Sequence, residues 1–152
     1  MTVNTTAGTI ELKELPGFVR TEAIGALERV MHSNLTEVKE NQIDVLIRNL
    51  AQARLEAAFG VAYAGIFGSQ IMGLTALEAR RKIAANEAYT FYQEFERKYP
   101  EVYNGYGFAG WLGFLKQRGL VETVGDDIRI TPQGDDFMRW LRATKVSVHK
   151  AF

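Results

Sequence analysis

The placement of glycine and proline in the last third of the chain constrains its fold more than any other sequence feature. Gly119 follows a run of residues whose apolar members share one helical face, at Phe108, Trp111, Leu112 and Leu115. A glycine at this place is typical of a helix end, because it adopts the left-handed conformation without strain. Residues 120–124 and 128–131 then flank Gly125-Asp126-Asp127, and this pattern predicts a β-hairpin.

A closing helix is predicted after the hairpin. Thr131 can cap this helix with its side chain, and Pro132 suits the first helical position. The inward face is expected to carry Phe137, Trp140 and Leu141. Residues 145–152 are expected to form a tail.

The run from Leu115-Lys-Gln-Arg-Gly119 to Ile128-Arg-Ile-Thr-Pro-Gln-Gly134 resembles a winged-helix domain. In that family the glycine ends the recognition helix, the hairpin forms the wing, and a leucine-threonine-x-x-glycine run begins the closing helix. Ile130 takes the place of the leucine here. The resemblance covers roughly residues 77–143, and winged-helix domains commonly bind DNA.

A second resemblance involves residues 67–71, Phe-Gly-Ser-Gln-Ile, together with Tyr99-Pro100 and Trp111-Leu112. This combination is similar to a small bacterial protein family of unknown function. It implies no activity.

The first half of the chain is predicted to be helical. Thr21 can cap a helix that runs to about His32, and Asn34 or Thr36 can open the longest helix. The long helix carries an apolar stripe with a spacing of three and four residues, at Ile43, Leu46, Ile47, Leu50, Ala53 and Ala57. Before it, a short strand is expected near residues 9–13, ended by Pro16-Gly17.

Small residues recur near the end of this helix, where Gly60, Ala64 and Gly68 lie four apart. A glycine inside a helix costs about 1 kcal/mol relative to alanine, so we expect either a close helix–helix approach or a break near residues 65–68. The predicted helix–helix interface comprises Ala53, Ala57, Gly60, Ala64 and Gly68. We expect a homodimer through this surface; the alternative is that the first helix folds back over it.

Another helix is predicted from residue 75 to residue 99. Thr75-Ala-Leu-Glu78 has the capping-box pattern, and one face carries Ile83, Ala84, Ala88, Phe91, Tyr92 and Phe95. Pro100 ends this helix and begins a short turn.

Taken together, these patterns predict a mainly α fold with a long helix in its first half and a C-terminal winged-helix-like unit that contains one β-hairpin. The expected divisions are a loose N-terminal arm at residues 1–18, a helical oligomerisation segment at 19–74, the winged-helix-like unit at 75–144 and the tail at 145–152.

Composition narrows the function classes. Cysteine is absent, which excludes disulfides, thiolate metal sites and a cysteine nucleophile. His32 and His149 are isolated, Ser69 lacks a nucleophile-elbow pattern, and the glycines at 105–110 do not follow a predicted strand. We therefore expect no enzyme activity and no cofactor.

The chain is expected to be cytoplasmic, without a signal peptide. Residues 57–77 contain no charged residue, but several glycines and polar residues interrupt this stretch. A buried helix with a turn is favoured over a membrane span.

DNA is one candidate partner. The phosphate contacts would come from seven basic residues: Arg80, Arg81, Lys82, Arg97, Lys98, Lys116 and Arg118. The eighteen acidic and eighteen basic residues balance, and Asp126 and Asp127 make the wing acidic, so both features disfavour DNA. The outward surface of the predicted recognition helix (Ala109, Gly110, Gly113, Lys116 and Gln117) is better suited to packing against a protein than to base readout.

Three function hypotheses follow. The first is a non-enzymatic regulatory protein of winged-helix type that acts on DNA, directly or within a complex, as in transcription regulation. The second is a protein–protein interaction or assembly module that binds an unidentified partner without DNA. The third is a small-molecule sensor that uses the aromatic residues at 89, 91, 92, 95, 99, 103, 106, 108, 111 and 114.

Overall fold

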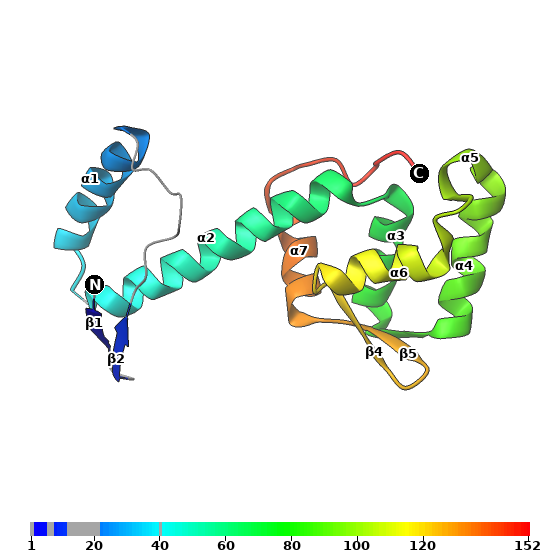
Figure 1. Ribbon diagram of the computed structural model, residues 1–152, viewed down its shortest axis with the longest axis horizontal. Coiled ribbons are helices and arrows are strands. Elements are labelled where there is room, and N and C mark those ends of the chain that lie inside the picture. Colours follow the sequence, from blue (N-terminus) through cyan, green and yellow to red (C-terminus); the bar gives the residue numbers. More distant parts are fainter. Residues whose placement is uncertain (1, 6–7, 12–21, 40) are drawn as a thin grey trace. The chain divides into compact units, whose positions relative to one another are not determined.

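The computed structural model of the protein describes residues 2–5, 8–11, 22–39 and 41–152 (Figure 1). Two compact units divide the chain, Met1–Arg54 and Leu55–Phe152. The predicted fold class is confirmed, because the chain is mainly α with a hairpin near its C-terminal end. Within the described residues, no helix is long and apolar enough to cross a membrane.

The first unit begins with an unexpected second hairpin. Strands β1 (Thr2–Thr5) and β2 (Gly8–Glu11) pair antiparallel, and β2 overlaps the short strand predicted near residues 9–13. The predicted cap at Thr21 and the turn at Pro16-Gly17 lie outside the described residues.

Helices α1 (Glu22–Thr36) and α2 (Gln42–Gly65) follow. The predicted opening of the long helix at Asn34 or Thr36 is wrong, because both residues lie in the last turn of α1. The Thr36 hydroxyl donates to the Ser33 carbonyl (2.7 Å) and so does not cap a new helix. Asn41 caps α2 instead, since its side-chain oxygen accepts the N–H of Ile43 (3.0 Å).

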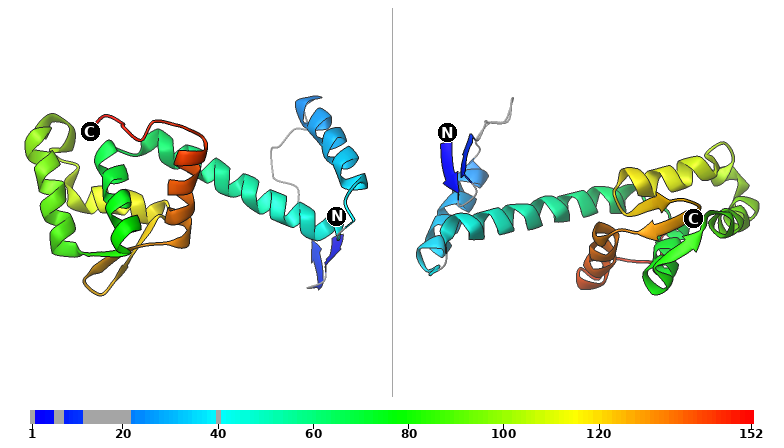
Figure 2. Two further views of the ribbon diagram at one scale, coloured as in Figure 1. Left: turned by 180° about the vertical axis from the view of Figure 1, so that it is seen from behind. Right: turned by 90° about the horizontal axis from the view of Figure 1, so that it is seen from below.

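The second unit contains the end of α2 and eight further elements. They are α3 (Gly68–Arg80), β3 (Lys82–Ala84), α4 (Ala85–Lys98), α5 (Pro100–Tyr103), α6 (Gly107–Gln117), β4 (Val121–Val124), β5 (Asp127–Ile130) and α7 (Pro132–Ala143). The strands form one antiparallel sheet in the order β3-β5-β4, and Figure 2 shows the three strands together.

The single helix predicted from Thr75 to Tyr99 is wrong in its start and its continuity, whereas its end before Pro100 is confirmed, because α4 ends at Lys98. Thr75 lies inside α3, where its hydroxyl donates to the Ile71 carbonyl (2.9 Å). Arg81 then adopts a left-handed backbone (φ 69°), and β3 separates α3 from α4. Pairing of β3 with β5 therefore overrides the helical periodicity that Ile83 suggested.

The predicted break near residues 65–68 is confirmed, because α2 ends at Gly65 and α3 begins at Gly68. The cap of α3 is the reverse half of a capping box, in which Gln70 Oε1 accepts the N–H of Phe67 (2.8 Å). This polar glutamine is fully buried.

The local predictions for the last third are confirmed. Gly119 follows α6 with φ 69°, and Gly125 turns the β4–β5 hairpin with φ 59°. Thr131 caps α7, since its hydroxyl oxygen accepts the N–H of Gly134 (3.0 Å). In α7, Phe137 and Leu141 are buried as predicted.

Residues 144–152 have no helix or strand, yet they pack against the start of α3. The Gly68 and Ser69 N–H groups donate to the main-chain oxygens of Ala151 (3.4 Å) and Phe152 (3.0 Å), and Lys150 Nζ donates to the carbonyl of Tyr63. The tail therefore satisfies N–H groups that the first turn of a helix leaves without internal partners.

Substitution of Gly134 tests the packing between α7 and the hairpin. A Cβ at this position would collide with the Leu120 carbonyl oxygen and lie 2.7 Å from Ile130 Cγ1. We expect Gly134→Ala to lower the free energy of unfolding by about 2 kcal/mol, because backbone cannot move aside cheaply. Urea denaturation measures this loss. Gly113→Ala is the matched control, since its Cβ would meet no atom within 4 Å; an equal loss in both variants would contradict the packing explanation.

Candidate functional site

The surface of α6 and the β4–β5 hairpin carries the residues that the sequence singled out for recognition. Ala109, Lys116 and Gln117 are exposed, whereas Gly110 and Gly113 are half-buried. Gly110 lies beneath the ring of Tyr106, whose Cδ2 would be 3.5 Å from an added Cβ. The outward surface of α6 thus consists mostly of small, uncharged residues.

Three of the predicted phosphate contacts are already paired with carboxylates. Arg80 binds Glu87, Arg81 binds Asp135 through two hydrogen bonds (2.8 and 2.6 Å), and Lys82 binds Asp127 (3.0 Å). The neighbouring guanidinium groups hold the pKa values of Glu87 and Asp135 below their usual range. A phosphate would have to displace these carboxylates.

The other four predicted contacts have different environments. Arg97 Nε donates to the Gln93 carbonyl (3.3 Å), and Lys98 Nζ lies 5.2 Å from the centre of the Tyr99 ring. At the end of α6, the Arg118 guanidinium lies 5.4 Å from the Phe114 ring centre. Lys116 is exposed and has no acidic partner within the described chain.

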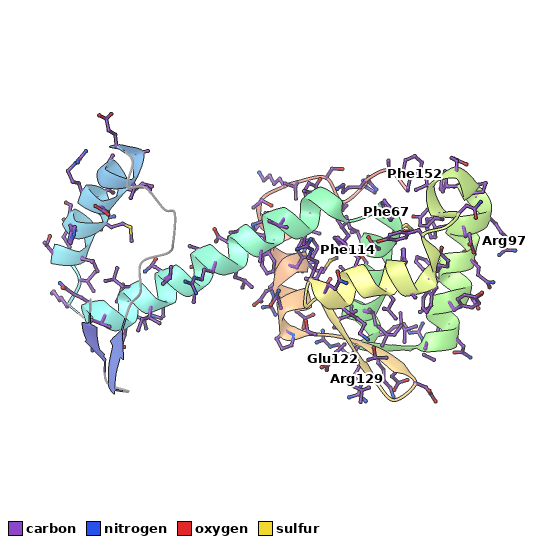
Figure 3. All side chains as sticks on the ribbon, viewed as in Figure 1. Phe67, Arg97, Phe114, Glu122, Arg129 and Phe152 are labelled. Atoms are coloured by element: carbon purple, nitrogen blue, oxygen red, sulfur yellow. The ribbon has the colours of Figure 1, made fainter. Side chains whose placement is uncertain are left out.

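Arg129 is a basic residue on the hairpin that the sequence reasoning missed. It is exposed in β5, and in the ladder it is registered with Glu122 of β4 (both labelled in Figure 3). On the other side of β5 it is registered with Lys82 of β3. The signal was present in Ile128-Arg-Ile130, because alternation in a strand points Arg129 away from the face that buries its two neighbours.

The predicted helix–helix interface falls on two helices. Ala53, Ala57, Gly60 and Ala64 are exposed in α2, and an added Cβ at Gly60 would meet no atom within 4 Å. Gly68 belongs to α3 and is buried, with its Cα facing the backbone of Lys150.

The predicted aromatic cluster forms a second core around Tyr92, Tyr103 and Trp111, all at most 3% exposed. Phe108 stacks against Trp111 (centroids 6.0 Å apart, planes at 21°). Most members of the cluster therefore pack against one another.

A chain of buried hydrogen bonds runs through this aromatic core. Trp111 Nε1 donates to Ser69 Oγ (3.0 Å), and Ser69 Oγ lies 2.6 Å from Tyr103 Oη. Tyr103 donates its proton to the main-chain oxygen of Phe152 (2.7 Å), so the Ser69 hydroxyl donates to Tyr103. Burial raises the pKa of Tyr103. Ser69 is thus a structural link between α3, α6 and the tail.

The structure also contains a cavity that no sequence pattern predicted. It lies in the second unit among α3, α4, α6 and the sheet, and its volume is about 100 Å³. Its walls are apolar, while Arg80 and Glu87 stand among its lining residues. Sequence reasoning could not pair these two residues, because their contact depends on the reversal between α3 and α4.

Among the described residues, no group of three histidine, aspartate or glutamate side chains lies close enough together to hold a metal ion. Within the same residues, no buried side-chain nitrogen or oxygen lacks a hydrogen-bond partner.

Ser69→Ala should destabilise the second unit. In the variant the buried Trp111 Nε1–H loses its acceptor, and the Tyr103 hydroxyl oxygen loses the hydrogen bond that it accepts from Ser69. Leaving such buried groups unsatisfied lowers the free energy of unfolding by about 1–3 kcal/mol. Urea denaturation followed by circular dichroism measures the change. Thr75→Ala is the control, because Thr75 is exposed and its hydroxyl bonds only within α3. A Ser69→Ala protein as stable as Thr75→Ala would refute the structural role.

Comparison with known proteins adds no relative to this picture. No protein-family model, no curated protein and no solved structure matches the chain.

Proposed function

We propose that the second unit contains a winged-helix domain and that the protein is a non-enzymatic regulatory protein, acting on DNA directly or within a complex. The observation that carries this proposal is the order of elements. Helices α4 and α6 precede the β4–β5 hairpin, the hairpin pairs with β3 in one sheet, and α7 closes the unit. Of these elements, the sequence resemblance implies the helix α6, the hairpin and the closing helix α7.

In this proposal α6 is the recognition helix and the hairpin is the wing. Gln117 at its end can donate and accept hydrogen bonds at a base edge, while Lys116 can reach a phosphate or a base. Lys116, Arg118 and Arg129 have no acidic partner in the described part of the chain. These three are the first candidates for phosphate contacts, ahead of the paired Arg80, Arg81 and Lys82.

The small number of such contacts predicts weak, strongly salt-dependent binding by one copy. The logarithm of the binding constant falls linearly with the logarithm of the salt concentration, and each neutralised phosphate steepens this slope by about 0.9. Two copies would double the contacts, so self-association is part of the proposal.

A titration of fluorescent duplex DNA at several salt concentrations tests this proposal. We expect Lys116→Ala and Arg118→Ala each to weaken binding and to reduce the salt slope by about one. Arg139→Ala is the control, because Arg139 is paired with Asp136 on α7 (2.8 Å). Absence of binding at low salt, where phosphate contacts are strongest, would remove the DNA-binding function and leave the protein-binding and small-molecule-sensor functions.

A second candidate function, a protein–protein interaction or assembly module, is favoured by exposed apolar side chains in the first unit. Leu27 and Val30 of α1 are 63% and 56% exposed, and Leu50 of α2 is 54% exposed. Along α2 the small and apolar residues at 43, 46, 50, 53, 57, 60 and 64 alternate in steps of three and four. This spacing is typical of a helix that packs against a second helix along one seam.

We propose that α2 forms this seam with the α2 of a second copy, giving a homodimer. Sedimentation equilibrium should show a dimer that Gly60→Leu or Ala64→Leu weakens far more than Lys116→Ala does. The open space at Gly60 makes the leucine harmless to a single chain. A protein that stays monomeric when concentrated, or equal effects of all three variants, would exclude the seam.

A further inference from the structure

The cavity of the second unit has an apolar interior. Its walls come from Gly73 and Ala76 of α3, Phe91 of α4, Trp111 and Leu115 of α6, and Ile128 of β5. Among its lining residues only Arg80 and Glu87 are charged. The interior therefore suits a hydrocarbon group, and any polar part of a ligand has to meet the pair.

The walls are fixed, whereas the charged pair is loose. Trp111 is held by its bond to Ser69 (3.0 Å), and Gly73 leaves room for the indole, since an added Cβ would lie 3.2 Å from Trp111 Cη2. In contrast, the side chains of Arg80 and Glu87 are 53% and 50% exposed. Exposed ion pairs contribute little stability, so this pair can open at small cost.

The volume sets the size of the hydrocarbon group. An engineered protein cavity of about 150 Å³ holds benzene, which has six carbons. By proportion, a cavity of about 100 Å³ accommodates about four carbons, the size of a valine or leucine side chain.

The charges set the chemistry of the polar end. A simple carboxylate bound to Arg80 would lie beside Glu87, and a simple ammonium bound to Glu87 would lie beside Arg80, so each would meet a like charge. A neutral ligand would make no charged contact to offset the loss of the Arg80–Glu87 ion pair. A ligand that carries a carboxylate and an ammonium on the same carbon atom pairs with both side chains at once.

We propose that this cavity is a binding site for a free aliphatic α-amino acid of the size of valine or leucine. The ligand's carboxylate accepts hydrogen bonds from the Arg80 guanidinium, its ammonium donates to the Glu87 carboxylate, and its side chain fills the space beside Trp111. The planar guanidinium already holds the Glu87 carboxylate through two parallel hydrogen bonds, so a second carboxylate can take the same place. The site does not depend on DNA binding.

Titration of the full chain with L-leucine, followed by NMR of the two tryptophan indole N–H groups, tests the site. Trp111 lines the cavity and Trp140 does not, so the Trp111 signal should shift saturably and the Trp140 signal should stay. Glycine, which lacks a side chain, should produce no shift. A Trp111 signal that does not move at millimolar leucine would overturn the proposal.

Variants test the two charges and the volume separately. Calorimetry should show at least tenfold weaker leucine binding for Arg80→Gln and for Glu87→Gln, while Arg81→Gln, the neighbouring arginine paired with Asp135, binds normally. Ala76→Leu should abolish binding by filling the cavity, whereas Ala79→Leu, at an exposed position of the same helix, should not.

Two analogues complete the test. 4-Methylpentanoate lacks the ammonium and 3-methylbutylamine lacks the carboxylate, and both should bind at least tenfold more weakly than leucine. If 4-methylpentanoate binds as well as leucine and Glu87→Gln strengthens it, the site takes carboxylates alone and the amino-acid proposal is wrong. Equal binding by Arg80→Gln and Arg81→Gln would equally refute it.

Discussion

The pairing of the three-residue strand β3 with β5 is the constraint on which the second unit depends. Ile83 is registered with Ile128, so the chain must leave its helix after Arg80, turn at Arg81 and begin α4 at Ala85. The same ladder attaches the hairpin to the helices, because β5 lies between β3 and β4. The reversal also brings Arg80 at the end of α3 beside Glu87 in the first turn of α4. One short strand thus fixes the position of the hairpin, the pairing of α3 with α4 and the charged edge of the cavity.

Sequence predicted the parts of this fold that local chemistry decides. The glycine after α6, the turn at Gly125 and the cap at Thr131 each require a particular residue type at one position, and all three are confirmed. The break before α4 could not be predicted, because Ile83 fits both a helical face and a strand, and its partner Ile128 is distant in the chain. The start of α2 failed for a different reason. Asn34, Thr36 and Asn41 are all residue types that favour the N-cap of a helix. Thr36 does not cap α2 because its hydroxyl donates to the Ser33 carbonyl, a contact that the sequence does not reveal.

For the candidate site, too, the sequence predicted the residues but not the contacts that depend on the fold. The seven basic residues were visible in the sequence, but their partners were not, since Arg81 meets Asp135 and Lys82 meets Asp127 across long stretches of chain. The buried bonds of Ser69 were equally hidden, because they join α3 to Trp111 in α6 and to Tyr103. Burying a serine hydroxyl without such partners would cost free energy. The presence of Ser69 in the uncharged stretch 57–77 is therefore explained only once the fold is known.

Net charge misleads for this chain because its ion pairs are unevenly distributed. Carboxylates neutralise Arg80, Arg81 and Lys82 around β3, and Arg139 and Arg142 on α7 are paired with Asp136 and Glu78. Acids used in these pairs cannot screen the basic residues of α6 and the hairpin, where Lys116, Arg118 and Arg129 have no acidic partner within the described residues. A formal charge of zero is therefore compatible with a local positive surface at the proposed recognition helix. Glu122 opposite Arg129 and Asp126 at the hairpin tip limit that surface, which favours a second copy as the source of further contacts over a single chain acting alone.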